Sequence, residues 1–131
     1  MASYLRGSDN FDSADNATQT ELDAKEVQMA TAWVNFDGTP TTPTISDSFN
    51  VSSITRNGVG DFTVNFTTAM DNANYTASLS GRGVVGNECI VVEQHDTPLR
   101  STTQLRIYTQ DNVGTLKDYP VVSVVIHGGK A

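Results

Sequence analysis

The sequence predicts an all-β protein, an antiparallel β-sandwich of about seven short strands that follows a short N-terminal extended segment. Three observations predict this fold: apolar and polar residues alternate from residue 32 onward, clusters of Gly, Pro, Asn and Asp separate the alternating runs, and Ser, Thr, Asn and Gly supply much of the polarity. Thr packs well on a pleated sheet, whereas Asn and Gly accept the dihedral angles of turns. The 131 residues are enough for one domain with its own core.

Residues 1–31 form a polar N-terminal extension. Six acidic and two basic residues give it a net charge of −4, out of −7 for the whole chain. Within it, residues 15–30 are compatible with a short helix, because Thr18 and Glu21 have the spacing of a capping box. The apolar stripe of such a helix is narrow, so the helix would either pack on something or fray.

Residues 32–131 are predicted to form one β-sandwich module. The predicted strands are residues 32–38, 48–56, 61–70, 74–81, 88–95, 101–110 and 119–128. The strongest hairpin signal is the loop of residues 57–60, Asn-Gly-Val-Gly, where glycine provides the positive φ that a chain reversal needs. The alternation predicts a core that contains Phe36, Phe49, Val51, Phe62, Val64, Phe66, Val122, Val124 and Ile126.

The last predicted strand departs from alternation, because only Ser123 interrupts five aliphatic residues between positions 121 and 126. A strand that is apolar on both faces is buried on both. One face can be the core, and the other needs a cover, which a partner subunit or a local loop could supply. The residues that we predict to form a contact between subunits are Trp33, Val121, Val122, Val124, Val125 and Ile126.

The charge and the reactive side chains argue against several function classes. A net charge of −7 repels the phosphate backbone of nucleic acid and anionic membrane surfaces. Cys89 is the single cysteine and lies in an apolar run, which predicts a buried, inert thiol. About 20 Å of extended strand would separate it from His95, and His95 and His127 lack the spacing of zinc ligands. We therefore predict no catalytic residues, no metal site, no cofactor and no membrane insertion.

Four stretches of the chain are informative as an ordered set: VQMATAWVNFDGT (27–39), SFNVSSITRNGVGDFTVNFTTAM (48–70), NYTASLSG (74–81) and VVSVVIHGG (121–129). Together they resemble a module of bacteriophage tail fibres and related virion fibres. The resemblance implies a β-sandwich-like module on a homotrimeric fibre of the virion, with a role in assembly or host attachment and with no catalytic residues. His127 matches the terminal His-Gly-Gly of that family, which implies a place at a subunit contact.

Residues 1–26 do not match the fibre pattern, and we expect them to dock on another virion protein. The apolar residues available for this anchor are Tyr4, Leu5, Phe11, Leu22 and Met29. Exposed loops are candidates for contact with a bacterial surface glycan or protein, at Arg82, Arg100 and Tyr119. Two alternatives stay open: a capsid or collar decoration protein with no host ligand, and a carbohydrate-binding module, which would be a monomer.

Overall fold

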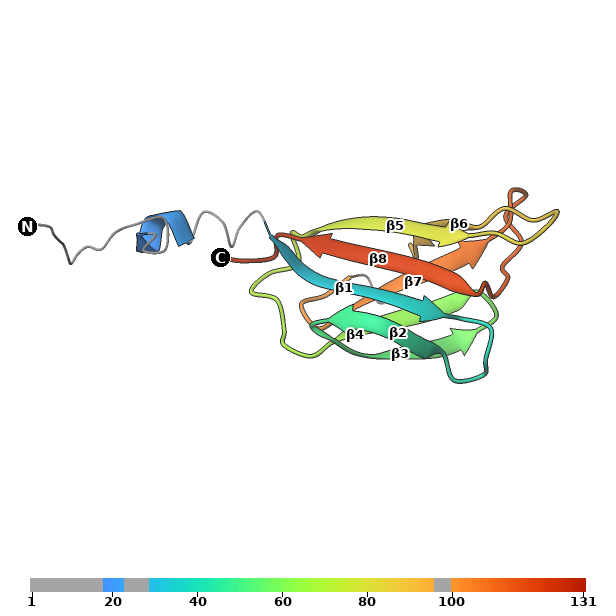
Figure 1. The fold of residues 1–131 in the computed structure, drawn as a ribbon, viewed down its shortest axis with the longest axis horizontal. Coiled ribbons are helices and arrows are strands. Elements are labelled where there is room, and N and C mark those ends of the chain that lie inside the picture. Colours follow the sequence, from blue (N-terminus) through green and yellow to red (C-terminus); the bar gives the residue numbers. More distant parts are fainter. Residues whose placement is uncertain (1–17, 23–28, 96–99) are drawn as a thin grey trace, which may run out of the picture.

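Two four-stranded antiparallel sheets pack face to face in the computed structural model, which describes residues 18–22, 29–95 and 100–131 (Figure 1). Sheet A has the strand order β2-β1-β8-β5, and sheet B has the order β3-β4-β7-β6. The predicted all-β sandwich is confirmed, with eight strands in the described residues instead of about seven. In chain order these are β1 Ala30–Asp37, β2 Thr44–Phe49, β3 Val51–Gly58, β4 Asp61–Phe66, β5 Thr76–Arg82, β6 Ile90–Glu93, β7 Gln104–Gln110 and β8 Val121–His127.

The run predicted as one strand, residues 48–56, belongs to two strands in different sheets. Strand β2 ends at Phe49 and β3 begins at Val51, so the chain crosses between the sheets at Asn50, which has a φ of 55°. Asn tolerates this left-handed conformation better than most residues. Its side chain also fixes the crossing, because Nδ2 donates to the carbonyl oxygens of Thr31 and Thr68, each at 3.1 Å, while Oδ1 accepts from the Thr68 amide at 2.7 Å.

The crossing at Asn50 makes the predicted core position of Phe49 wrong. Phe49 is 53 % exposed and pairs with Trp33 in the register of β1 and β2. Because the strand ends there, Phe49 follows the alternation of sheet A, not that of β3. A β-bulge between Val51 and Ser53 then shifts the alternation again, and Val51 and Ile54 are both buried.

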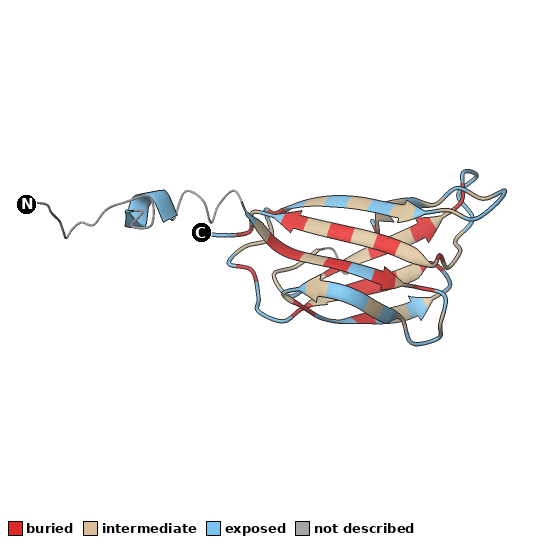
Figure 2. Cartoon of the chain, viewed as in Figure 1, coloured by how far each residue is buried: buried red, intermediate tan, exposed pale blue. Residues whose placement is uncertain are grey.

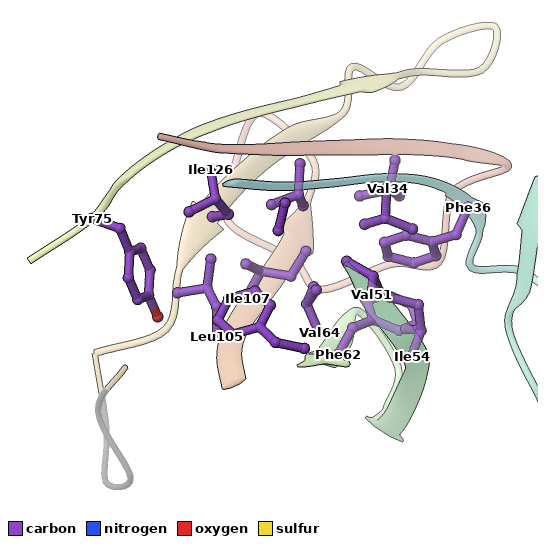
Figure 3. Close-up of a cluster of buried hydrophobic side chains, with 14 of the residues drawn as sticks. Val34, Phe36, Val51, Ile54, Phe62, Val64, Tyr75, Leu105, Ile107 and Ile126 are labelled. Carbon is purple, nitrogen blue, oxygen red and sulfur yellow. The ribbon is translucent and has the colours of Figure 1, made fainter. Parts of the chain in front are cut away.

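The hydrophobic core lies between the two sheets and draws on alternate residues of their strands (Figure 3). Every predicted core residue except Phe49 is buried. The rings of Phe36 and Phe62 meet edge to face, with centroids 5.3 Å apart, and link β1 of sheet A to β4 of sheet B. Leu105 and Ile107 of β7 were not among the predicted core residues, and both are completely buried.

The connections divide the sandwich into two ends (Figure 1). The described chain enters the sandwich at Met29 and leaves at Ala131 on one side, here called the terminal end, which also holds the β2–β3, β4–β5 and β6–β7 connections. The opposite side, here called the loop end, holds the other four connections. Asp71 holds the C-terminus in place, because its Oδ2 accepts a hydrogen bond from the Ala131 amide at 2.9 Å.

One turn of helix, residues 19–22, precedes the sandwich. The predicted capping box is confirmed: the Glu21 amide donates to Thr18 Oγ1 at 3.1 Å, and the Thr18 amide donates to Glu21 Oε1 at 2.9 Å. Residues 15–17 and 23–28 of the predicted helix lie outside the described residues, and Ala30 already belongs to β1. No helix in the described part of the chain is long and apolar enough to cross a membrane.

Candidate functional site

The outer face of sheet A carries a row of large apolar side chains that no described segment of the chain covers completely. The strand register places Phe49 of β2, Trp33 of β1 and Val125 of β8 side by side, and Ser78 of β5 continues the row. Phe49 is exposed, while Trp33 and Val125 are half-buried. We call Phe49, Trp33 and Val125 the hydrophobic row. The next row of the same face is polar, with Asp47, Asn35, Ser123 and Ser80 in register.

The structure corrects part of the predicted subunit contact. Val122, Val124 and Ile126 lie in the core of their own chain and are at most 1 % exposed, so their side chains cannot reach a second copy. Val121 and Val125 lie on the outer face of β8 and are half-buried, and Figure 2 shows this alternation along the strand. The neighbouring strands partly cover Val121 and Val125, because β8 is a central strand with β1 and β5 on its two sides.

Trp33 and His127 remain available on the outer face of sheet A. Trp33 is half-buried beside Phe49, and His127 is exposed at the end of β8, where it pairs with Ala30 and Thr76. Phe49 is the member of this surface that sequence reasoning missed. The neighbouring Asn50 could have indicated that Phe49 ends a strand, since an Asn between two alternating runs is a common point for one strand to end and the next to begin.

The loop end presents a second cluster of exposed apolar residues. Val85 is fully exposed in the β5–β6 loop, Val113 is 79 % exposed in the β7–β8 loop, and Val59 and Val84 are about half exposed. Between these two loops lies an open pocket of about 610 Å³. Its lining residues are Gly81, Gly83, Val84, Gly86, Asn87, Glu88, Cys89 and Asn112. Sequence reasoning missed these valines, although a Val-Val pair between two glycines was a signal.

Of the three predicted ligand residues, only Arg82 lies at this surface as an exposed side chain. It ends β5 next to Gly81 and Gly83 of the pocket, and no hydrogen bond or ion pair of Arg82 is found in the described residues. Tyr119 is 1 % exposed, so its predicted role in ligand contact is wrong. Its hydroxyl donates to the Glu88 carbonyl oxygen at 2.9 Å and thereby ties two loops together.

Further bonds hold the loop end in one conformation. Lys117 Nζ lies 3.2 Å from Asp111 Oδ2 and 2.9 Å from Asn87 Oδ1, so it connects the β7–β8 loop to the β5–β6 loop. Asp111 also accepts hydrogen bonds from the amides of Thr115 and Val113. The amide of Thr115 is the main cause that holds the pKa of Asp111 below its ordinary value. The exposed valines therefore lie on loops that hydrogen bonds and an ion pair connect to one another.

Arg100 is engaged at the opposite, terminal end. Its guanidinium forms an ion pair with Glu93, lies 4.6 Å from the centre of the Tyr75 ring and donates to the Tyr75 carbonyl oxygen. Burial is the largest cause that raises the pKa of Tyr75 to about 12. The Tyr75 hydroxyl donates to the carbonyl oxygens of Ser101 and Gln104. This cluster ties Arg100 to Glu93 of β6 and to Tyr75. Arg100 is therefore already engaged within its own chain, and its contact with a ligand stays a prediction.

The outer face of sheet B is polar and internally hydrogen-bonded along β3 and β4. Asn65 Nδ2 donates to Ser53 Oγ at 3.1 Å and to Thr55 Oγ1 at 3.0 Å across the β3–β4 pair. Arg106 of β7 holds Asp61 of β4 through two hydrogen bonds, of 2.8 and 2.6 Å. The hydrogen bonds from Arg106 are the main cause that lowers the pKa of the Asp61 carboxyl. Several polar side chains of this face are therefore already hydrogen-bonded to one another.

The lowered pKa of Asp61 predicts a loss of stability in acid. A carboxyl whose pKa is lower in the folded state stabilises that state above its unfolded pKa, and this contribution disappears as the pH falls through the folded pKa. Below about pH 4, we therefore expect Asp61→Asn to lose less free energy of unfolding than the wild type does. At neutral pH the variant should be less stable by about 1 kcal/mol. Urea unfolding at a series of pH values measures both.

The control for this prediction is Asp47→Asn, at an exposed position of β2. Asp61→Asn should reduce the acid-induced loss of stability more than this control does. Equal acid dependence in the wild type and in Asp61→Asn would contradict the assigned role of the pair between Asp61 and Arg106.

The predicted anchor residues are only partly described. Tyr4, Leu5 and Phe11 lie outside the described residues, whereas Leu22 is 47 % and Met29 is 62 % exposed. Met29 directly precedes β1 and faces a pocket at the terminal end. An exposed apolar residue at this entry point is compatible with a docking role.

Among residues 18–22, 29–95 and 100–131, no group of three His, Cys, Asp or Glu side chains could hold a metal ion. Cys89 is half-buried against the core, and burial raises the pKa of its thiol, which disfavours the reactive thiolate. His95 is exposed just after β6.

In comparisons with known proteins, no family model matches the chain, and neither a curated protein nor a solved structure matches it.

Proposed function

We propose that this chain is a non-enzymatic structural module of a bacteriophage fibre that associates with copies of itself in the virion. In this proposal the outer face of sheet A forms the contact between copies. Residues 1–26 dock on another virion protein, and the loop end points outward for assembly or host attachment. The proposed oligomer is a homotrimer, as in the fibres that the sequence resembles.

The observation that carries the proposal is the hydrophobic row on the outer face of sheet A. An aromatic ring, an indole and a valine lie in register on three neighbouring strands, and Phe49 at the edge is 53 % exposed. Single exposed apolar residues are common, but contiguous aromatic and aliphatic side chains on one face are typical of an interface. The polar row beside it, which includes Asp47 and Asn35, fits the rim of such an interface.

The arrangement of the two ends supports the direction of the proposed fibre. The described chain enters at Met29 of the terminal end, so an N-terminal anchor would leave the loop end farthest from the attachment point. The exposed Val85 and Val113, together with Arg82, are then placed where a module meets a second molecule. Linked copies make weak contacts of this kind useful, because they raise the effective concentration.

The mass of the purified full-length chain in solution tests the proposal. We expect a trimer in native mass spectrometry, and we expect Phe49→Ser to raise the dissociation constant of the trimer at least about tenfold, because an aromatic anchor leaves the interface. The matched control is Ile90→Ser, which changes an exposed aliphatic residue of sheet B and should leave the trimer intact. A wild-type chain that stays monomeric at micromolar concentration would contradict the proposal.

Deleting residues 1–26 separates the alternatives that the proposal leaves open. If the module attaches to host cells, the shortened chain still binds cells but no longer joins the virion. If it is a capsid or collar decoration, the chain binds no cells in either form. A carbohydrate-binding module would be a monomer that binds glycan, so the mass measurement also distinguishes this third class.

A further inference from the structure

The terminal end of the sandwich contains a pocket of about 420 Å³. It lies where the chain enters β1, where it crosses from β2 to β3, and along the segment that follows β4. Its lining residues are Met29, Ala30, Thr31, Phe49, Asn50, Thr67, Thr68, Ala69, Met70 and Lys130.

The pocket is suited to an apolar occupant. Met29 is 62 % and Phe49 is 53 % exposed, whereas Met70 is 5 % exposed. The buried polar groups nearby are already used, because the Asn50 amide holds the strand crossing and Thr31 Oγ1 donates to the Ile126 and Gly128 carbonyl oxygens. A polar ligand would gain few hydrogen bonds from these groups, whereas an apolar side chain would remove the exposed thioether and ring from water.

We infer that this pocket binds the N-terminal segment of the same chain, residues 1–22, through its apolar side chains. Those side chains are Tyr4, Leu5, Phe11 and Leu22. The inference requires that the segment can reach the pocket, that it is attracted to it, and that it competes well with other apolar molecules.

Reach follows from the chain itself. Met29 lines the pocket, and only the six residues 23–28 separate it from Leu22. Seven residue steps span up to roughly 24 Å when extended, so Leu22 can fold back to the pocket that Met29 lines, and Phe11 has more chain to do so. A tether of this length gives an effective concentration of about a millimolar or more, which a separate protein in solution rarely reaches.

Charge favours the same occupant. Residues 1–22 contain four acidic side chains and one basic side chain, for a net charge of −3. The charged residue among those that line the pocket is Lys130, a cation. An acidic segment that carries a few apolar residues therefore complements an apolar pocket with a lysine beside it.

The pocket would bind the segment whether or not the chain belongs to a fibre. In a fibre, the same segment would leave the pocket to dock on the neighbouring virion protein, so the bound form is the state of the chain before assembly. The structure has residues 18–22 outside the pocket, with Leu22 47 % exposed, which corresponds to the released form.

Methionine methyl groups provide a direct test in the full-length chain, because two of the three methionines, Met29 and Met70, line the pocket. The probe is the NMR spectrum of the 13C-methyl-labelled protein with a soluble paramagnetic agent. We expect the Met29 methyl to be protected from the agent in the wild type. In the variant Leu5→Ser/Phe11→Ser/Leu22→Ser, both methyl resonances should shift, and the relaxation of the Met29 methyl by the agent should rise several-fold.

The matched control is Ser3→Ala/Ser8→Ala/Ser13→Ala, which changes three polar residues of the same segment and should leave both methyl resonances in place. Methyl groups that are equally exposed in the wild type and in the first variant would overturn the inference. Protection that persists in that variant would also overturn it, because a second copy would then cover the pocket. Protection that disappears on dilution would show that the segment comes from another copy, which contradicts binding within one chain.

The mass of each sample is measured in the same experiment. A monomeric wild type with a protected Met29 would contradict the fibre proposal and support the pocket inference. A trimeric wild type with an unprotected Met29 would do the opposite, so the two failures can be told apart.

Discussion

Replacing Phe62 with alanine is expected to lower the free energy of unfolding by about 3–5 kcal/mol, the usual cost of removing a fully buried aromatic side chain. Phe62 is 0 % exposed, and its ring meets the Phe36 ring edge to face between the two sheets (Figure 3). Gly38 lies directly against the same ring, since a Cβ at that position would come within 2.7 Å of Phe62 Cζ. Close packing on both sides leaves little room for the structure to collapse into the cavity.

Urea unfolding followed by circular dichroism measures this loss, and Phe49→Ala is its matched control. The two variants remove the same atoms, but Phe49 is 53 % exposed on the outer face of sheet A. We expect the control to cost less than about 1 kcal/mol at concentrations where the chain is monomeric. Similar losses for the two variants would contradict the assignment of Phe62 to the core and Phe49 to the surface.

The difference between these two phenylalanines shows how far the sequence predicts the fold. Within β4 the alternation is regular, so Phe62, Val64 and Phe66 were placed correctly in the core. Phe49 precedes Val51 with the same period of two. Phe49 and Phe62 have the same side chain, so the side chain alone cannot tell the exposed residue from the buried one. What separates them is one residue, Asn50, whose positive φ moves the chain from one sheet to the other.

The errors in the predicted subunit contact arise because the sequence alone does not show which strands lie next to each other in a sheet. The valine-rich last strand was correctly placed as buried, but whether its outer face needs a second copy depends on which strands lie beside it. Strands β1 and β5 flank β8, and they leave Val121 and Val125 half-buried within one chain. The exposed aromatic residue of that face comes from β2, an edge strand that was not predicted.

Long-range contacts explain the error at Tyr119 and the engagement of Arg100. Tyr119 follows a polar loop, which suggested exposure, but its hydroxyl reaches the carbonyl oxygen of Glu88, 31 positions away in the chain. Arg100 likewise contacts Tyr75, which directly precedes β5 and lies 25 positions away in the chain. The capping box at Thr18 and Glu21 was predictable because it is local, with donor and acceptor groups only three positions apart in the chain.

The Gly60→Ala substitution is expected to destabilise the chain by about 3 kcal/mol or more, since it combines an unfavourable dihedral angle with a steric clash. Gly60 has a φ of 65° in the turn between β3 and β4. A Cβ there would lie 2.5 Å from the Thr109 carbonyl oxygen and 2.7 Å from the Lys117 amide nitrogen. Both are backbone atoms of the loop end, so no side-chain rotation can relieve the contact.

The position of Gly60 makes the expected effect extend beyond its own turn. Its amide donates to Asp118 Oδ1 at 2.8 Å, and its carbonyl oxygen accepts from the Thr109 amide at 2.9 Å. Asp118 also holds Arg56 of β3 in an ion pair of 2.7 Å. Pushing the turn away from β7 would therefore weaken all three connections together, in a domain whose total stability is on the order of 5–15 kcal/mol.

Gly58→Ala is the matched control, because it changes a second glycine of the same hairpin. A Cβ at Gly58 would meet nothing within 4 Å, and its φ is not positive. Alanine at this position restricts the unfolded chain, so we expect a change within about 1 kcal/mol that can be stabilising. Thermal unfolding of both variants measures the contrast, and a Gly60→Ala variant as stable as Gly58→Ala would show that the β3–β4 turn does not pack on the β7–β8 loop as the structure has it.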